Sequence, residues 1–550
     1  MNAVRFFTLI AISALSLSAT RAADWTLHYD APASGSSAQS IQIQWETAVG
    51  SETSDGYWFT GSEYTSENAM KGWLAEYEND NFSFGSTDGR ETDSGTVYDT
   101  LFLNLNSDIT FGGLTFLGHA WDNSARINAN RHNITVNGDI IRDASSYNGF
   151  INNVNILTVK NNIDVQGSNF AITGNKMIVN GNVLSTKGGA NLYLSISGLS
   201  ESGSDSAANT FENPGVVING YASNISVQAK PTNSDNYTQI GGLTNNASIK
   251  REAPANAGSN DYVSYFILTN AQDYSTGADI SESNGNVWTS TSGKLAIIMN
   301  GTASQSFTNS RLQFQGGLQI MGGTLRVNFN QNGSYYNYKR DAAKLIDVTF
   351  VTQDGGSTRT AFSHGNLQML GGTFASTEGS SSYGAFRFTN IIYTSGTVSL
   401  RLESATQMDS LDLTSYYNRV ADTTTGEEVV TYELVEGGAI SFAEGAGKFS
   451  FNFEGDLTWL IDSEDGSFDI NGGLGAKIVA WDSGKGAGLS GDNFSANIFE
   501  SAGDAYRAEF AIGDDGLYVK YVAVPEAAEV AAILGALALA AAALRRRNRN

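Results

Sequence analysis

The sequence predicts an all-β solenoid, in which short strands stack in successive turns around one continuous core. Three observations lead to this prediction. The chain of 550 residues contains 60 Gly but only 5 Pro and no Cys. A short strand-like motif returns at intervals near 20 residues, which is typical of stacked repeats. The hydrophobic fraction of 41% is large enough to supply the stacked core that stabilises such a fold without disulfides.

Composition also narrows the function. The formal net charge is −24, which argues against nucleic-acid binding, because that needs a basic surface to displace counterions. An acidic surface also resists adsorption to anionic membranes. The absence of Cys excludes disulfides, thiolate catalysis and thiolate zinc sites. We expect no cofactor.

The first element, residues 1–22, reads as a signal peptide. Arg5 precedes an uncharged run from Phe6 to Leu17, and small residues follow. We expect cleavage after Ala22, so that the mature chain begins at Ala23 and is exported through the inner membrane. The alternative is a buried helix that starts the fold.

Residues 23–104 are expected to form an N-terminal cap over the open end of the first turn. The best helix of the body is predicted here, from Ser66 to Asn79, with Ser66 as its N-cap. The segment is rich in aromatic residues: Trp25, Trp45, Tyr57, Trp58, Tyr64, Trp73 and Tyr77.

Residues 105–400 carry the repeats. Their alternating apolar residues predict one buried strand face, and the following Asn-Gly or Asn-Asn predicts a turn with positive φ. We expect turns of roughly 22 residues, on the order of 13 of them, with Asn ladders at equivalent positions. An array of β-sandwiches is the competing fold. The motif appears at Ile134-Thr-Val-Asn-Gly, Leu157-Thr-Val-Lys-Asn, Met177-Ile-Val-Asn-Gly and Val216-Val-Ile-Asn-Gly, and the wide last interval is interpreted as two turns.

A second motif recurs at longer range. Gly316-Gly-Leu-Gln-Ile-Met-Gly-Gly-Thr-Leu325 matches Gly365-Asn-Leu-Gln-Met-Leu-Gly-Gly-Thr-Phe374. Gly-Gly-Thr followed by an apolar residue resembles the strand repeats of autotransporter passenger domains. The resemblance implies a right-handed parallel β-helix. A complete autotransporter would end in a membrane barrel of alternating strands, whereas this chain ends in an Ala-rich run and an Arg cluster.

Residues 401–523 are predicted to form a C-terminal β-region. The alternation from Gly447 to Phe453 is typical of a hairpin, and Asp514-Asp515-Gly516 reads as a hairpin turn.

Residues 524–550 form a tail with three parts. Pro525 and Glu526 precede an uncharged run from Val530 to Leu544, and a basic cluster ends the chain. A helix over that run would cover roughly 22 Å, less than the roughly 30 Å of a hydrocarbon core. The basic cluster should stay cytoplasmic; it contains Arg545, Arg546, Arg547 and Arg549.

This tail resembles the PEP-CTERM sorting signal of Gram-negative bacteria, with Ala527 where the family usually has Pro. The resemblance implies a single C-terminal hydrophobic helix that is held transiently in the inner membrane. It also implies processing by an exosortase near Pro525 and Glu526, with Arg545, Arg546 and Arg547 as the basic part of the signal. Delivery to the cell surface or the extracellular matrix would follow. A plain hydrophobic tail anchor is the alternative.

No catalytic, cofactor or metal residue is predicted. Arg131, His132, Asp139, Arg142 and Asp143 are the one local cluster of mixed catalytic types, and chance accounts for it. The acidic run from Asp462 to Asp469 lacks the alternating ligands of a calcium loop and reads as a solvated turn. Three aromatic residues could stack on sugars or simply pack in a loop: Tyr335, Tyr336 and Tyr338.

The sequence therefore favours a non-enzymatic surface or matrix protein, a structural spacer or adhesin that contacts exopolysaccharide or cell-surface glycans. The alternative is a polysaccharide lyase or glycosidase on a β-helix. Such an enzyme needs paired carboxylates, or a basic residue beside a bound acidic sugar, aligned across neighbouring turns. A groove lined by Asn, Ser and Thr alone would favour the first hypothesis.

Overall fold

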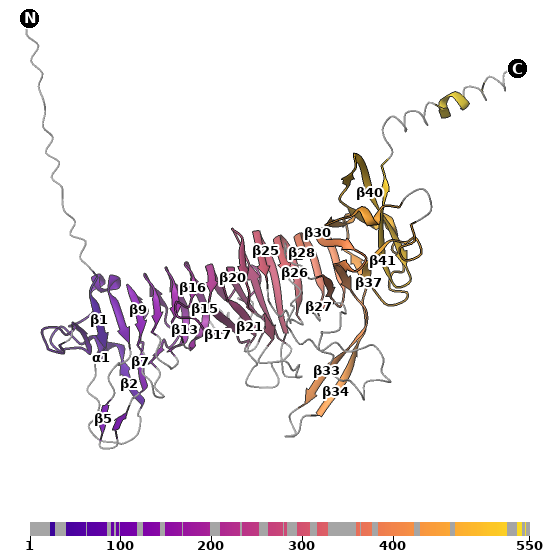
Figure 1. Cartoon of the computed structure of the whole chain (residues 1–550). Coiled ribbons are helices and arrows are strands. Elements are labelled where there is room, and N and C mark those ends of the chain that lie inside the picture. Colours follow the sequence, from indigo (N-terminus) through magenta and orange to yellow (C-terminus); the bar gives the residue numbers. More distant parts are fainter. Residues whose placement is uncertain are drawn as a thin grey trace, which may run out of the picture.

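The structure is a computed structural model of the chain. The residues that it describes are 22–27, 40–61, 63–84, 90–92, 95–97, 100–117, 125–143, 149–167, 169–197, 209–231, 234–251, 262–278, 280–282, 294–308, 316–327, 359–362, 365–376, 383–422, 429–462, 468–524, 536–541 and 545. The described part is nearly all β, with long strands in parallel pairing, and this is compatible with the predicted all-β solenoid. Figure 1 shows the strands stacked side by side along an elongated body.

Parallel pairing connects the strands into columns that run along this body. The column that contains the first sequence motif joins strands from residue 109 to residue 442. Its members are β8 (Ile109–Phe111), β11 (Ile134–Val136), β13 (Gly149–Val159), β15 (Asn169–Val179), β18 (Val216–Ser223), β20 (Asn236–Thr244), β22 (Val263–Leu268), β25 (Lys294–Phe307), β26 (Gly317–Val327), β28 (Leu367–Ser376), β30 (Ile391–Ser404) and β35 (Ile440–Phe442).

Two further columns lie beside it. The second column contains the N-terminal halves of β13 and β15. Its other members are β2 (Ser40–Gln44), β7 (Thr100–Asn104), β10 (Ala125–Asn128), β17 (Ala190–Ile196), β19 (Ile225–Ala229), β21 (Ser248–Arg251) and β24 (Ser281–Glu282). The third column joins β1 (Asp24–Leu27), β4 (Asn81–Phe84), β9 (Gly113–Phe116), β12 (Ile140–Arg142), β14 (Ile163–Val165), β16 (Val183–Leu184) and the C-terminal halves of β18 and β20.

The third of these columns resumes further along the chain. β23 (Tyr274–Thr276) pairs with the C-terminal half of β25, and the C-terminal halves of β26, β28 and β30 follow. β36 (Phe449–Glu454) and β38 (Phe494–Ala496) end this series. The alternation at 447–453 therefore belongs to a parallel strand, and the predicted hairpin there is wrong. One buried face produces the same alternation in either pairing direction.

Both sequence motifs mark true register positions. Ile134 pairs with Leu157, Leu157 with Met177, and Met177 with Val216. Leu318 pairs with Leu367 in the longer motif. Met177 and Val216 are direct neighbours, so the interpretation of that interval as two turns is wrong. An insertion lengthens the turn instead, and turns of uneven length make the regular estimate of roughly 22 residues too simple.

Amide ladders follow the turns, as predicted. The Asn155 side chain donates to Asn133 Oδ1 at 3.0 Å, and Asn175 donates to Asn155 Oδ1 at the same distance. In a neighbouring ladder, Asn162 donates to Asp139, and Asn162 accepts from the Asn182 N–H. Each amide thereby satisfies its neighbour in the stack.

The Asn-Gly turns need Gly for a different reason than positive φ. Gly138 and Gly181 do not have positive φ. A Cβ on Gly181 would lie 2.5 Å from the Asn161 carbonyl oxygen of the neighbouring turn. A Cβ on Gly138 would lie 2.6 Å from the Gly112 carbonyl oxygen. Gly is therefore required because two turns approach each other closely.

The aromatic residues of the N-terminal segment pack over the first strands. Trp45 contacts Trp58, Trp73 and Phe111, with ring centroids 5.2 to 6.4 Å apart. Short elements carry these residues: α1 (Trp45–Val49), β3 (Trp58–Thr60) and the 3-10 helix η1 (Ala75–Asn79).

The helix predicted from Ser66 to Asn79 is wrong except for η1 at its end. The backbone of Met70 hydrogen-bonds to Trp58 and Gly56, and Gly72 has a φ of 74°. Burial of Met70 through these extended contacts outweighs helix propensity.

A second sheet lies towards the C-terminal end. β27 (Arg359–Phe362), β29 (Gly384–Arg387), β32 (Ser410–Asp412) and β37 (Ala476–Ala480) pair in parallel. Antiparallel strands β41 (Gly516–Ala523), β40 (Asp504–Gly513) and β39 (Phe499–Ser501) complete it. Gly513 pairs with Gly516, which confirms the predicted hairpin turn at Asp514 and Asp515.

Two pairs of strands form separate two-stranded sheets, and the tail is described in part. β5 (Arg90–Thr92) pairs with β6 (Gly95–Val97), and β33 (Tyr416–Asp422) pairs with β34 (Val429–Val435). Residues 536–541 and Arg545 are helical and exposed. No long C-terminal helix is seen among the described residues, and none of their helices is long and apolar enough to cross a membrane.

Candidate functional site

A groove of about 570 Å³ crosses the C-terminal halves of β26, β28, β30, β36 and β38. Successive side chains of these strands point alternately into the core and towards the groove. Leu325, Phe374 and Val398 point into the core and are buried. The residues on either side of each core residue face outward and line the groove.

The first outward row consists entirely of hydroxyl residues. In-register pairing joins Thr324 to Thr373, Thr373 to Thr397, Thr397 to Ser450, and Ser450 to Ser495. Since neighbouring strands lie about 4.8 Å apart, the row extends over roughly 19 Å. These five side chains are half-buried, and their hydroxyls make no hydrogen bond within the described part of the chain.

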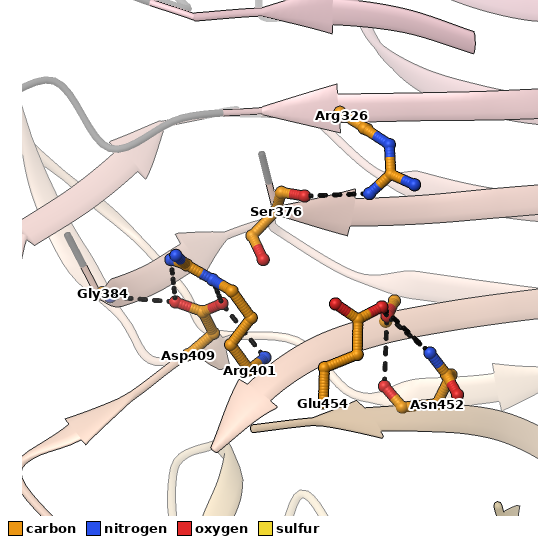
Figure 2. A network of polar contacts seen from close by, with 8 residues as sticks. Arg326, Ser376, Gly384, Arg401, Asp409, Asn452 and Glu454 are labelled. Carbon is orange, nitrogen blue, oxygen red and sulfur yellow. Dashed lines mark hydrogen bonds and ion pairs between the residues drawn. The ribbon is translucent and has the colours of Figure 1, made fainter. Parts of the chain in front are cut away.

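The second outward row is more varied. Arg326, Ala375, Ser399 and Asn452 follow one another in register. Ser399 donates to Glu454 Oε1 at 2.6 Å, and Asn452 donates to the same oxygen at 3.0 Å. Figure 2 shows Glu454 held in this way, with Arg326 donating to the Ser376 carbonyl oxygen across the site.

A buried ion pair lies beside the groove. Arg401 donates from Nε to Asp409 Oδ2 at 2.8 Å and from Nη2 to Oδ1 at 3.1 Å (Figure 2). The Gly384 N–H also donates to Asp409. The Arg401 guanidinium lies 4.6 Å from the centre of the Tyr383 ring. These contacts link the C-terminal part of β30, which carries Thr397, to the start of β29.

Comparison with protein-family models, with curated proteins and with solved structures finds no match to this chain.

The local cluster of mixed catalytic types is held by separate contacts. His132 Nδ1 lies 3.5 Å from Asp108, while Asp139 accepts from Asn162 and Asp143 lies near Lys187. Arg142 is buried, and desolvation lowers its pKa to about 10. Its guanidinium donates to the carbonyl oxygens of Phe116 and Asp143. These contacts hold His132, Asp139, Arg142 and Asp143 in separate places, and Arg131 is exposed.

Most of the predicted sorting residues cannot be placed. Pro525, Glu526, Arg546 and Arg547 lie outside the described residues, as do Tyr335, Tyr336 and Tyr338. Arg545 is exposed and helical. Ala22 and Ala23 are described and half-buried at the start of β1. In the acidic run, Asp462 accepts from Lys520 Nζ at 2.6 Å. Within the described residues, no group of three or more His, Asp or Glu could hold a metal ion.

The groove residues were not predicted, although the sequence contained a signal for them. Thr324 and Thr373 are the Thr of the Gly-Gly-Thr motif, and Thr397 follows Gly396 in the same way. By itself, the Gly-Gly-Thr motif indicates only strands. Chemically, a row of free hydroxyls flanked by amides, one carboxylate and one guanidinium can form many neutral hydrogen bonds with a long polar ligand.

Proposed function

We propose that the chain is an exported, non-enzymatic protein of the cell surface or extracellular matrix, and that its groove binds a neutral polysaccharide. In this proposal the body is a right-handed parallel β-helix that acts as a spacer or adhesin. The continuous columns of parallel strands support such a rod. The observation that carries the binding proposal is the in-register row of five hydroxyls without hydrogen bonds among the described residues.

The chemistry of the groove favours a neutral glycan. Hydroxyls both donate and accept, so they match the alternating donors and acceptors of sugar hydroxyls. A net charge of −24 repels a polyanion at long range. A chain lying along the rod would meet a new hydroxyl about every 4.8 Å.

Binding is favoured over catalysis by the charges of the lining. Retaining and inverting glycosidases use two carboxyl groups that flank one glycosidic bond. The lining residues include one carboxylate, Glu454, and both of its donors are neutral side chains. Arg326 and Glu454 distinguish this groove from an entirely neutral one, so a polysaccharide lyase or glycosidase is kept as an outcome of the test.

The two ends of the chain support export and sorting in the proposal. Residues 1–22 would be removed as a signal peptide. An exosortase-type enzyme would recognise Pro525, Glu526 and the Arg cluster that begins at Arg545, while the C-terminal helix is transiently in the inner membrane. Release to the surface or matrix would bring the groove to exopolysaccharide or to the glycans of a neighbouring cell.

Calorimetric titration tests the binding proposal. The probes are soluble neutral glycans (a β-glucan, a xyloglucan and a galactomannan) and one anionic glycan, alginate. The variant Thr373→Val with Thr397→Val removes two central hydroxyls and keeps their shape. Each neutral hydrogen bond contributes about 0.5–1.5 kcal/mol, so losing two should lower the affinity for the bound neutral glycan roughly fivefold to 150-fold.

The matched control is Thr135→Val with Thr158→Val. These two Thr residues also pair in register and are half-buried, but they lie in another column, outside the groove. Unchanged affinity in this control and a loss in the groove variant would support the proposal. Equal losses in both variants, or binding of alginate alone, would contradict it. Release of reducing ends that Glu454→Gln abolishes would establish the enzymatic alternative.

A further inference from the structure

Ala23 is bound at both of its backbone polar groups at the start of β1. Its N–H donates to Asp80 Oδ1 at 2.8 Å, and its carbonyl oxygen accepts from the Asn81 N–H at 2.9 Å. The second oxygen of Asp80 accepts from Trp25 Nε1 at 2.8 Å. One carboxylate therefore holds both the backbone of the residue directly before β1 and the side chain of the first buried Trp.

Asp80 is a buried carboxylate, and the groups that donate hydrogen bonds to it among the described residues are neutral. Its exposed fraction is only 8%. None of the ion pairs among the described residues includes Asp80. The neighbouring 3-10 helix η1 adds negative charge through Glu76 and Glu78. A carboxylate in such surroundings is costly unless a cation accompanies it.

We propose that Ala23 is the mature amino terminus and that Asp80 is the binding site for the α-ammonium group that signal removal creates. An envelope signal peptidase hydrolyses the Ala22–Ala23 bond. Water supplies the hydroxyl of the new Ala22 carboxyl group and a hydrogen to the Ala23 nitrogen, which takes up a further proton. The resulting ammonium replaces a neutral N–H donor with a charged one at the same oxygen.

The proposal rests on the export part of the proposed function and adds a structural consequence to it. Ala22 and Ala23 are both half-buried in the folded protein, so cleavage should precede the docking of β1. β1 is the first strand of its column and pairs with β4 and β3. Cleavage would therefore complete the N-terminal cap by supplying the cation that Asp80 lacks among the described residues.

Two forms of the chain test the proposal without any substitution. One begins at Ala23, and the other begins at Ala22 and continues to the same C-terminus. The longer form keeps the Ala23 N–H but moves the ammonium by about one residue, roughly 3.8 Å. Charge-assisted hydrogen bonds are about twice as strong as neutral ones. Hydrogen exchange of the β1 and β4 amides should be roughly five- to tenfold slower in the form that begins at Ala23.

Two substitutions identify the carboxylate responsible. Asp80→Asn should abolish the difference between the two forms. Glu78→Gln, which neutralises an exposed carboxylate two residues away, should preserve it. Equal exchange in the two unsubstituted forms would overturn the pairing with Asp80, and so would a difference that persists in Asp80→Asn.

Mass spectrometry of the protein from its native host separates this inference from the function proposed above. A mature chain that begins at Ala23 is the expected result. A chain that retains residues 1–22, or begins elsewhere, would overturn the inference. Glycan binding by the groove is measured independently and would be unaffected by a failure here.

Discussion

The buried pair Arg401–Asp409 allows a sharp prediction about what stabilises the borders of the groove. Asp409 has an exposed fraction of 0% and Arg401 of 8%. Asp409→Ala removes the acceptor of the two guanidinium bonds and of the Arg401 and Gly384 N–H groups. It also leaves a buried positive charge without this carboxylate. Losing one partner of a buried pair costs about 3–5 kcal/mol, so we expect a destabilisation of that size.

A variant that replaces both charged residues tests whether the cost comes from the lost ion pair or from the unpaired charge. Arg401→Met with Asp409→Leu removes both charges and refills the space, so its free energy of unfolding should lie within about 2 kcal/mol of the parent value or above it. Urea unfolding followed by tryptophan fluorescence measures both. Trp481, which directly follows β37, is buried and contributes to this signal.

An exposed pair supplies the matched control. Arg507 donates to Glu509 at 3.0 Å, but both side chains are largely exposed, at 59% and 42%. Glu509→Ala should therefore cost less than about 1 kcal/mol. If Asp409→Ala costs no more than Glu509→Ala, then the buried pair does not stabilise the groove border and the reasoning is refuted.

Three further predictions concern other parts of the chain. Gly181→Ala should destabilise the protein by more than about 1 kcal/mol, because its Cβ meets the Asn161 carbonyl oxygen, whereas Gly447→Ala has open space; thermal unfolding compares them. Burial, and then the charges of nearby groups, raise the pKa of Tyr237 to about 12. The folded state thus retains a proton that the unfolded state loses near pH 10, so stability should fall as pH rises from about 10 through 12, and less so in Tyr237→Phe; urea midpoints across this range measure the loss. Glu526→Ala should leave the tail attached in the native host, seen as a higher intact mass; an unchanged mass would contradict recognition of Glu526.

The sequence predicted the stacking of this chain well, because stacking depends on a local pattern. Ile134, Leu157 and Met177 share one position in one motif, and identical positions of a repeated turn must coincide for the core to remain continuous. The amide ladders follow from the same stacking, since neighbouring turns bring Asn133, Asn155 and Asn175 into contact.

Features that depend on contacts between distant segments could not be predicted in this way. Arg401 and Asp409 are eight residues apart, but only the turn between β30 and β31 (Gln407–Met408) brings their side chains together. The role of Asp80 depends on β1 docking beside it from 55 or more residues away. The predicted helix at 66–79 failed for the same reason, since Met70 is buried by pairing with Trp58.

The amide and hydroxyl rows show how one geometric rule produces both a structural and a functional surface. Parallel stacking places equivalent side chains about 4.8 Å apart. An amide carries a donor and an acceptor on separate atoms, so a row of amides can satisfy itself, as Asn133, Asn155 and Asn175 do. The short side chains of Thr373 and Thr397 make no such bond among the described residues, although they are paired in register. Their hydroxyls remain open to a ligand that extends along the row, and this difference in reach is why the groove, rather than the amide ladders, is the place to look for glycan binding.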